Sequence, residues 1–166
     1  MRFSAVFTVI FAAFASAAPL LHQKRAARSF SQISIGGGVG GNALAEAKAK
    51  FPGTAATLSA ATTSDFNADA HCSVLAEQAY LDAGAIASSN KATNGVSVAL
   101  FKNKVLKIYG TLLVVQAEVA QNGGKASASQ QAQIDDLTTK LAANVAIDKK
   151  NAGIASKDVS FTCPSA

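Results

Sequence analysis

The stretch from Val96 to Gln121 constrains the fold of this chain more than any other. Its apolar residues recur at alternating steps of three and four, the spacing that places side chains on one face of an α-helix. Seven residues form this seam: Val98, Phe101, Val105, Ile108, Leu112, Val115 and Val119. Four further apolar residues lie off the seam: Leu100, Leu106, Leu113 and Val114. The sequence therefore predicts a central helix that packs against partners on more than one side.

Three other segments are predicted to be helical. Residues 42–51 begin at Asn42, a residue type favoured at helix N-termini, and end before Pro52. Residues 65–89 carry a mixed apolar set: Val74, Leu75, Leu81 and Ile86 with Ala70, Ala79 and Ala85. Residues 128–152 present one apolar face: Ile134, Leu137, Leu141 and Val145. We therefore expect an all-α bundle of three long helices plus a shorter N-terminal one.

The connections between these helices have recognisable signals. Residues 53–64 are almost wholly Ala, Thr, Ser and Gly, a composition that suits a surface linker. The central helix should end at Asn122-Gly123-Gly124, because glycine adopts the left-handed conformation that closes a helix. Ser127 and Gln130 have the spacing of a capping box for the next helix. Because this connection is short, the last two helices should run antiparallel.

The first 17 residues have the pattern of a secretory signal peptide. Arg2 supplies a positive start, and residues 3–14 form an apolar run too short to span a membrane. Ala15-Ser16-Ala17 places small residues where a signal peptidase reads them, so cleavage is expected before Ala18. The alternative is a buried core helix. We expect a secreted, extracellular protein.

A dibasic pair, Lys24-Arg25, follows soon after the predicted signal cleavage. In a secreted chain it resembles the processing site of a kexin-type protease, which makes residues 18–25 a short propeptide and Ala26 the first mature residue. The alternative is an exposed basic tail. Removing residues 1–25 leaves 12 basic and 10 acidic residues, a net charge of +2. So small an excess gives no support to nucleic-acid binding.

Residues 26–166 are enough for one domain with a real core. Cys72 and Cys163 are the only two cysteines. In an oxidising compartment a single disulfide between them is expected, and it would tie the C-terminal tail to the body. A free buried thiol and a nucleophile are the alternatives. His71 adjoins Cys72, but neighbours on a helix point about 100° apart, so adjacency does not make a catalytic pair.

The segment before the first helix contains an arm and a glycine run. Phe30, Ile33 and Ile35 could contact a core, and we expect residues 26–35 to be an extended arm lying over helices. Residues 36–41 satisfy the dinucleotide-binding pattern G-x-G-x-x-G by letter. That fingerprint works between a strand and a helix of a βαβ unit, and no second strand pattern follows. We therefore predict a flexible hinge.

The inventory of catalytic side chains is thin. His71 is the only histidine after residue 25, no His/Cys cluster has metal-ligand spacing, and Asp135 and Asp136 are adjacent and hence on different faces. A hydrolase built on His71 stays open, because serines and aspartates are plentiful. We expect no enzyme activity, no cofactor and no metal, and no membrane span in the mature chain, where Lys102, Lys104 and Lys107 interrupt the most hydrophobic region.

Those three lysines are the one group of charged residues whose spacing suggests a common surface. Lys104 and Lys107 share a helical face away from the seam. They are predicted to be either a solvated face or a surface that contacts an acidic wall polymer, an acidic protein or, in a host cell, an import receptor.

Several segments of the chain together carry a resemblance to known sequences: the MRFS leader with its Lys-Arg site, SFSQISI before the glycines, GNALAEAKAKF, FKNKVLKIYG, LTTKLAANVAIDKKNAG and a tail containing cysteine. In these segments the chain resembles a family of small secreted proteins of filamentous fungi. It implies secretion and a helical fold, and it carries no site residues. Some members are discussed as effectors of plant- or insect-associated fungi.

These observations favour a secreted, non-enzymatic interaction protein that binds a host or extracellular protein, as a candidate effector associated with virulence. A structural protein associated with the cell wall, a hydrolase and a carrier of an apolar ligand are the alternatives.

Overall fold

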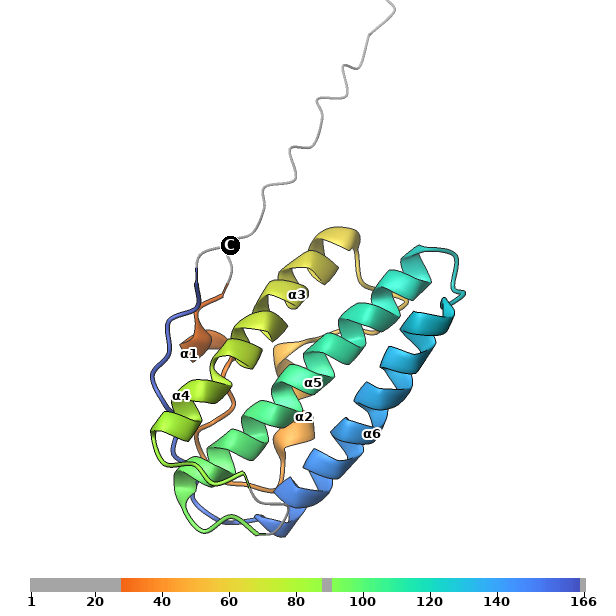
Figure 1. The fold of residues 1–166 in the computed structure, drawn as a ribbon. Coiled ribbons are helices and arrows are strands. Elements are labelled where there is room, and N and C mark those ends of the chain that lie inside the picture. The colour runs from red at the N-terminus through yellow and green to blue at the C-terminus, as the bar shows by residue number, and fades with distance from the viewer. Residues whose placement is uncertain (1–27, 88–90, 165–166) are drawn as a thin grey trace, which may run out of the picture.

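The computed structural model describes residues 28–87 and 91–164 and shows a helical bundle (Figure 1). Its helices are, in chain order, α1 (Phe30–Ile33), α2 (Ala43–Lys50), α3 (Ala60–Leu75), α4 (Glu77–Asp82), α5 (Gly95–Gln121) and α6 (Ala128–Lys150). These described residues form two isolated β-bridges and no strand. The predicted all-α class is confirmed. Residues 1–17 and 18–25, including Lys24 and Arg25, lie outside the described residues, so their processing stays a prediction.

Helix α5 is the predicted central helix. At its N-terminus the Asn94 side-chain oxygen accepts a hydrogen bond from the Ser97 backbone N–H at 2.8 Å. At its C-terminus the Gly124 N–H donates to the Val119 carbonyl at 2.9 Å. Gly123 and Gly124 have φ of 91° and 76°, the left-handed region that only glycine adopts readily. The helix therefore begins and ends at local signals that the sequence carries.

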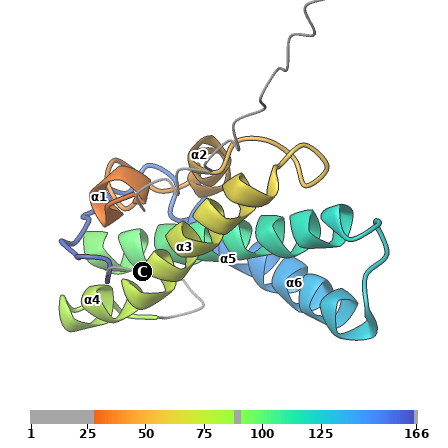
Figure 2. The same cartoon turned by 90° about the horizontal axis from the view of Figure 1, so that it is seen from above.

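Nearly every side of α5 is covered. Six of the seven seam residues are buried and Val119 is half-buried, and the four apolar residues off the seam are buried as well. Figures 1 and 2 show α3 and α6 flanking α5, with α1 and α2 across another side. The prediction that this helix packs on more than one side is confirmed.

Two buried clusters attach the short elements to α5. In one, the rings of Phe51 and Phe66 meet edge to face with 5.2 Å between centroids. In the other, the Phe30 ring meets Tyr80 at 6.3 Å and Phe161 at 5.7 Å, both edge to face. Edge-to-face aromatic pairs add to the stabilisation from burial. The core therefore continues from the long helices into the arm and the tail.

Helix α3 begins and ends at other residues than predicted. It starts at Ala60, inside the predicted linker, because the Ser59 hydroxyl accepts a hydrogen bond from the Thr62 backbone N–H at 3.1 Å. It ends at Leu75, and α4 follows after Ala76. The helix predicted over residues 65–89 is therefore two helices, and the second ends at Asp82.

Helix α6 returns antiparallel to α5, as expected from the short connection (Figure 1). The predicted capping box is present: the Ser127 hydroxyl accepts from the Gln130 N–H at 3.2 Å, and the Gln130 side chain accepts from the Ser127 N–H at 3.0 Å. All four residues of the predicted apolar face are only half-buried. Asp148 is the one buried residue of α6.

The described part of the predicted arm, residues 28–35, lies over the bundle, and Phe30, Ile33 and Ile35 are buried. It is not fully extended, because residues 30–33 form the helical turn α1.

The run after the arm, residues 36–41, is named the glycine loop. Three backbone hydrogen bonds join it to the tail: Gly40 N–H to Ile154 O (3.0 Å), Gly153 N–H to Gly40 O (3.1 Å) and Ser156 N–H to Gly38 O (2.8 Å). Asp148 also accepts hydrogen bonds from the N–H groups of Gly41 (2.9 Å) and Ala43 (2.8 Å). The prediction of a flexible hinge is wrong, because hydrogen bonds with the tail and with Asp148 of α6 hold the loop in place.

The tail over residues 152–163, named the strap, crosses the ends of several elements. Lys157 N–H donates to the Gly95 carbonyl at 2.9 Å, at the start of α5. Asp158 accepts hydrogen bonds from the hydroxyls of Tyr80 (2.5 Å) and Ser34 (2.7 Å). Cys163 forms a disulfide with Cys72 of α3, with 5.4 Å between the Cα atoms. The predicted disulfide is confirmed.

Candidate interaction surface

The residues considered for catalysis do not converge. Cys72 is in the disulfide and is therefore no nucleophile. His71 is exposed on α3, and no hydrogen bond or ion pair joins its ring to another described side chain. Asp135 and Asp136 are exposed on α6, where Asp136 pairs with Lys140 at 2.6 Å. Among residues 28–87 and 91–164, no group of three or more His, Cys, Asp and Glu side chains is placed to hold a metal ion.

The predicted surface of Lys102, Lys104 and Lys107 is wrong for Lys102, which is buried. Lys102 is 0% exposed, and its ammonium donates to the carbonyls of Gly37 (2.6 Å) and Val39 (3.1 Å) in the glycine loop. The same ammonium forms an ion pair with Glu46 of α2 at 2.8 Å. A buried ammonium needs such partners, because leaving water unpaired costs several kcal/mol. Lys102 is therefore a structural residue that links α5, α2 and the glycine loop.

Lys104 and Lys107 remain at the surface, and both pair with Glu77 at the start of α4. The Lys104 ammonium lies 3.5 Å from the Glu77 carboxylate, and Lys107 pairs with its other oxygen. The Lys104 ammonium also lies 5.7 Å from the centroid of the Phe101 ring. Two ammonium groups against one carboxylate leave a local charge of about +1. The three side chains form a partly exposed group between α4 and α5, named the Glu77 cluster.

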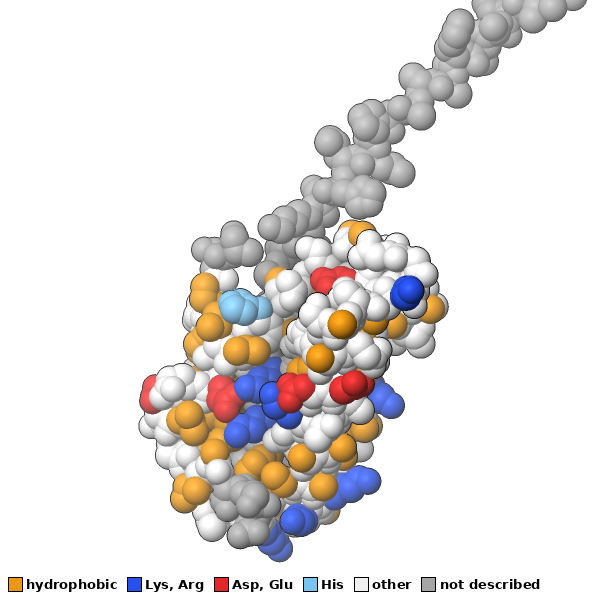
Figure 3. Space-filling view, turned by 45° about the vertical axis from the view of Figure 1, so that its right-hand side comes forward, with side chains coloured by type: hydrophobic (Ala, Val, Ile, Leu, Met, Phe, Trp, Pro, Cys, Tyr) orange, Lys and Arg blue, Asp and Glu red, His pale blue; other side chains and the backbone are white. Residues whose placement is uncertain are grey.

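Large apolar side chains lie exposed beside this cluster. Four of them lie on α3, on α4 and in the segment after α4: Val74, Leu75, Leu81 and Ile86, with 42%, 36%, 37% and 55% exposure. This set is named the α3–α4 stripe. Glu77 is three residues after Val74 and four before Leu81, so on a helical path it sits between them. Figure 3 shows Lys and acidic side chains gathered across the middle of one face, with hydrophobic side chains on either side.

The stripe reverses the sequence prediction for residues 65–89. The large residues expected to face the core are outside, while Ala70 and Ala85 are buried. The reason is a close approach of α3 to α5: a Cβ on Gly110 would lie 2.7 Å from Phe51 Cζ and 3.1 Å from Ala70 Cβ. Only a small side chain fits opposite Gly110, where Ala70 lies, and Ser73 of α3 and Ala76 at its C-terminal end are buried as well. The larger side chains are left on the outer face.

An open hollow of about 410 Å³ lies between the glycine loop and α2. Glu46 and Lys50 contribute its charged groups. Both have partners already, since Glu46 pairs with Lys102 and the Lys50 ammonium donates to the Gln32 carbonyl at 2.6 Å. The hollow is open to solvent, unlike the enclosed apolar cavity that a carrier of an apolar ligand uses. It offers little convergent polar chemistry for a substrate.

Comparison with known proteins identifies a family. A family model described as a domain of unknown function, DUF8454, matches residues 25–160. The chain belongs to the DUF8454 family. No curated protein and no solved structure matches the chain. Membership of DUF8454 therefore adds no activity, and the surface has to be interpreted from its own chemistry.

Sequence reasoning did not find the α3–α4 stripe or the Glu77 cluster. The three charges of the cluster come from segments about 30 residues apart, so no local motif joins them. One signal was present: residues 65–89 mix large and small apolar side chains on different faces, and either set can be the buried one. Which set is buried depends on the shape of the helix that packs against this segment, α5.

Proposed function

We propose that this protein is a secreted, non-enzymatic interaction protein that binds another protein through the α3–α4 stripe and the Glu77 cluster. The main support for this proposal is the exposure of the α3–α4 stripe. Exposed apolar side chains beside charged groups are typical of protein interfaces, which have an apolar centre and a polar rim. The partner is expected to place apolar side chains on the stripe and an acidic group near Lys104 and Lys107.

Secretion is the second part of the proposal. The signal-peptide pattern of residues 1–17 supports it, and a disulfide is typical of proteins exposed to an oxidising compartment. In the described ranges, no helix has the length and apolar character needed to cross a bilayer. The family match starts at Arg25, next to the predicted first mature residue. An extracellular or host protein is therefore the partner class we propose.

The test is an affinity capture with paired variants. The form starting at Ala26 is immobilised, and proteins retained from host extracellular fluid are compared between the wild type and the double variant Leu75→Gln, Leu81→Gln. Both side chains are more than one third exposed, so their replacement should leave the fold intact. Val39→Gln is the matched control, because Val39 is 51% exposed on the glycine loop, outside the stripe.

The expected result is a partner whose affinity falls about tenfold or more with the stripe variant and is unchanged with the control. Equal retention by all three proteins would exclude the stripe as the binding surface. Fractionation of the producing cells distinguishes this proposal from the main alternative, a structural protein of the cell wall. A structural wall protein stays with the wall, whereas an interaction protein of this kind is found in the fluid.

A further inference from the structure

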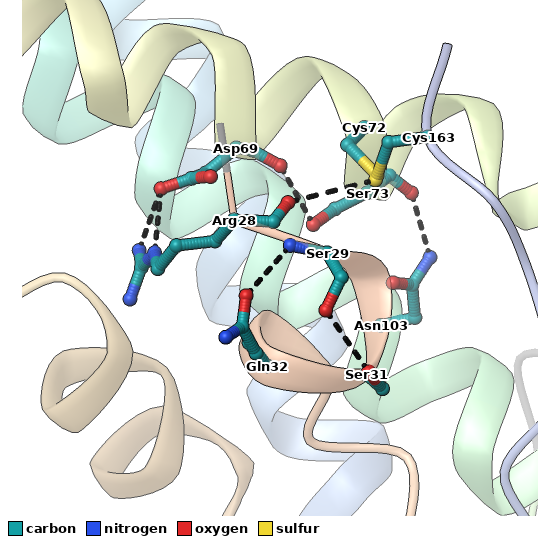
Figure 4. Close-up of a disulfide and its surroundings, with 9 residues drawn as sticks. All are labelled: Arg28, Ser29, Ser31, Gln32, Asp69, Cys72, Ser73, Asn103 and Cys163. Carbon is teal, nitrogen blue, oxygen red and sulfur yellow. Dashed lines mark hydrogen bonds and ion pairs between the residues drawn. A yellow bond between two sulfur atoms is a disulfide. The ribbon is translucent and has the colours of Figure 1, made fainter. Parts of the chain in front are cut away.

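Three segments of the chain meet at the N-terminal end of α5. The segment before α5 is joined to the end of α6, because the Ala92 N–H donates to the side-chain oxygen of Asn151 at 2.8 Å. The strap joins them at Lys157, where a Cβ on Gly95 would lie 3.3 Å from the Lys157 Cβ. The far end of the strap is fixed to α3 by the disulfide (Figure 4). This end of the bundle is therefore assembled from segments that are held in place.

Each of these segments carries exposed lysines. They are Lys91 before α5, Lys149 and Lys150 in the last turn of α6, and Lys157 in the strap. This set is named the basic end. The ion pairs within residues 28–87 and 91–164 use other cations, so none of the four lysines has a carboxylate partner there. Figure 3 shows Lys or Arg side chains gathered at the lower end of the face, below the acidic side chains across its middle.

The excess positive charge of the protein is concentrated at this end. From residue 28 to residue 164 the chain has 12 basic and 10 acidic side chains. The carboxylates next to the basic end in the chain are Asp148 and Asp158, and both have partners: Asp148 accepts from two backbone N–H groups and Asp158 from two hydroxyls. Four lysines against these two carboxylates leave +2, and the remaining eight basic and eight acidic side chains cancel. The protein is therefore neutral overall apart from one positive end.

The residue type indicates what such a surface binds. All four side chains are lysine, whose ammonium is a compact, hydrated point charge, whereas arginine selects planar anions through paired hydrogen bonds. The four lysines come from three segments and line no part of the hollow beside α2. They suit a long partner with repeated negative charge better than one small anion, because each exposed contact is weak and only several contacts together hold the partner.

We propose that the basic end binds an acidic polysaccharide, a sugar polymer with repeated carboxylate groups. The inference rests on the proposed secretion and adds a second surface, separate from the α3–α4 stripe. Outside the cell such a polymer is the fitting polyanion, because the anionic lipids that attract basic proteins lie on the cytoplasmic leaflet. The lysines for which the sequence predicted an acidic polymer pair with Glu46 and Glu77, whereas those of the basic end form no such pair in the described ranges.

The test compares two variants of equal net charge in the protein that starts at Ala26. The first variant replaces three lysines of the basic end: Lys149→Gln, Lys150→Gln and Lys157→Gln. The matched control replaces three exposed lysines elsewhere: Lys48→Gln on α2, Lys125→Gln between α5 and α6, and Lys140→Gln on α6. Both variants should keep the fold, because exposed side chains contribute little to stability, and melting temperatures check this. Binding to immobilised polygalacturonate is measured at low and at high salt.

We expect the variant of the basic end to bind about tenfold or more weakly than the wild type at low salt, with a shallower dependence on salt. The physical reason is that fewer ammonium groups then displace counterions from the polymer. The control variant should bind nearly as well as the wild type, although its net charge is the same as that of the first variant.

Equal losses in the two variants would overturn the proposal, because net charge alone would then explain the binding, and so would a wild type that the polymer does not retain at low salt. Binding to vesicles of phosphatidylcholine with phosphatidylserine, but not to polygalacturonate, would also refute it and indicate an anionic membrane. Neither variant changes the stripe, so capture of a protein partner tests the proposed function separately. Because salt releases the polymer contact, cell fractions washed at high salt still distinguish this protein from a structural wall protein.

Discussion

Lys102 connects three parts of the chain from a position with no contact to water. Its partners are the Glu46 carboxylate and two carbonyls of the glycine loop, at Gly37 and Val39. Asp148 has the matching role at the other end of the loop, where it accepts from two backbone N–H groups. Polar groups of this loop that would otherwise be unpaired are therefore satisfied by buried charges from α5 and α6.

Replacing Lys102 with methionine should destabilise the protein by about 3 kcal/mol, because the two carbonyls and Glu46 lose their donor in a buried site. This loss is near the lower end of the range for removing one partner of a buried ion pair, because Glu46 is about one third exposed and can be hydrated. Denaturant unfolding measures the change. Lys140→Met is the control, because its ion pair with Asp136 on α6 is exposed and should change stability by less than about 1 kcal/mol. A loss for Lys102→Met as small as the control would contradict this role.

The phenol of Tyr80 predicts a dependence of stability on alkaline pH. Burial, reinforced by the hydrogen bond to Asp158, raises the pKa of Tyr80 above its ordinary value of 10.0. The unfolded state therefore loses this proton near pH 10 while the folded state keeps it. The stabilisation is complete below that pH, and the free energy of unfolding should fall by about 1.4 kcal/mol per pH unit above it.

Tyr80→Phe should remove this contribution, so its stability should decline less steeply than that of the wild type between about pH 10 and 11. Burial also raises the pKa of Tyr109, but that residue is present in both proteins and cancels in the comparison. Parallel curves for the two proteins would show that the Tyr80 proton is not retained on folding.

At the scale of elements, the strap packs across several helices and connects them, a role that a further helix would have in a larger bundle. It contacts the glycine loop, the start of α5, Tyr80 of α4 and Cys72 of α3 with only a few residues at each. Short extended segments bury little apolar surface, so they depend on specific bonds to stay in place. The disulfide is the covalent part of that attachment.

The double variant Cys72→Ala, Cys163→Ala should lose about 3–5 kcal/mol of unfolding free energy, since the bridge closes a loop with a sequence separation of 91 residues. Denaturant unfolding of the oxidised wild type, the reduced wild type and the variant measures this effect. The last two proteins should agree within about 1 kcal/mol, because both lack the cross-link. A variant as stable as the oxidised protein would mean that the strap is held by its non-covalent contacts alone.

At the scale of the whole molecule, burial is unequal between the two longest helices. Helix α5 is buried on nearly all sides, whereas Asp148 is the one buried residue of α6. The apolar face of α6 covers α5 but stays half-exposed itself. A helix with one shallow interface opens more readily than one enclosed by its neighbours.

Hydrogen exchange should therefore separate α6 from α5. Amides in residues 105–114 of α5 should exchange only through global unfolding, and amides in residues 131–141 of α6 through an opening of lower free energy. Exchange at increasing denaturant distinguishes the two, because global opening depends steeply on denaturant and local opening hardly at all. Equal free energies and equal slopes would show that the two helices open as one unit.

The sequence by itself determined the helices that depend on local signals. The spacing of apolar residues and the caps at Asn94, Gly124 and Ser127 define α5 and α6, because caps and periodicity act within a few residues of the chain. The two cysteines, together with the predicted export to an oxidising compartment, were enough to predict the disulfide. Tertiary structure alone decided which face of α3 is buried, because the close approach at Gly110 admits small side chains and leaves Val74 and Leu75 outside. It also decided that Lys102 is inside the molecule, since its partners lie more than 50 residues away and no local pattern brings them together.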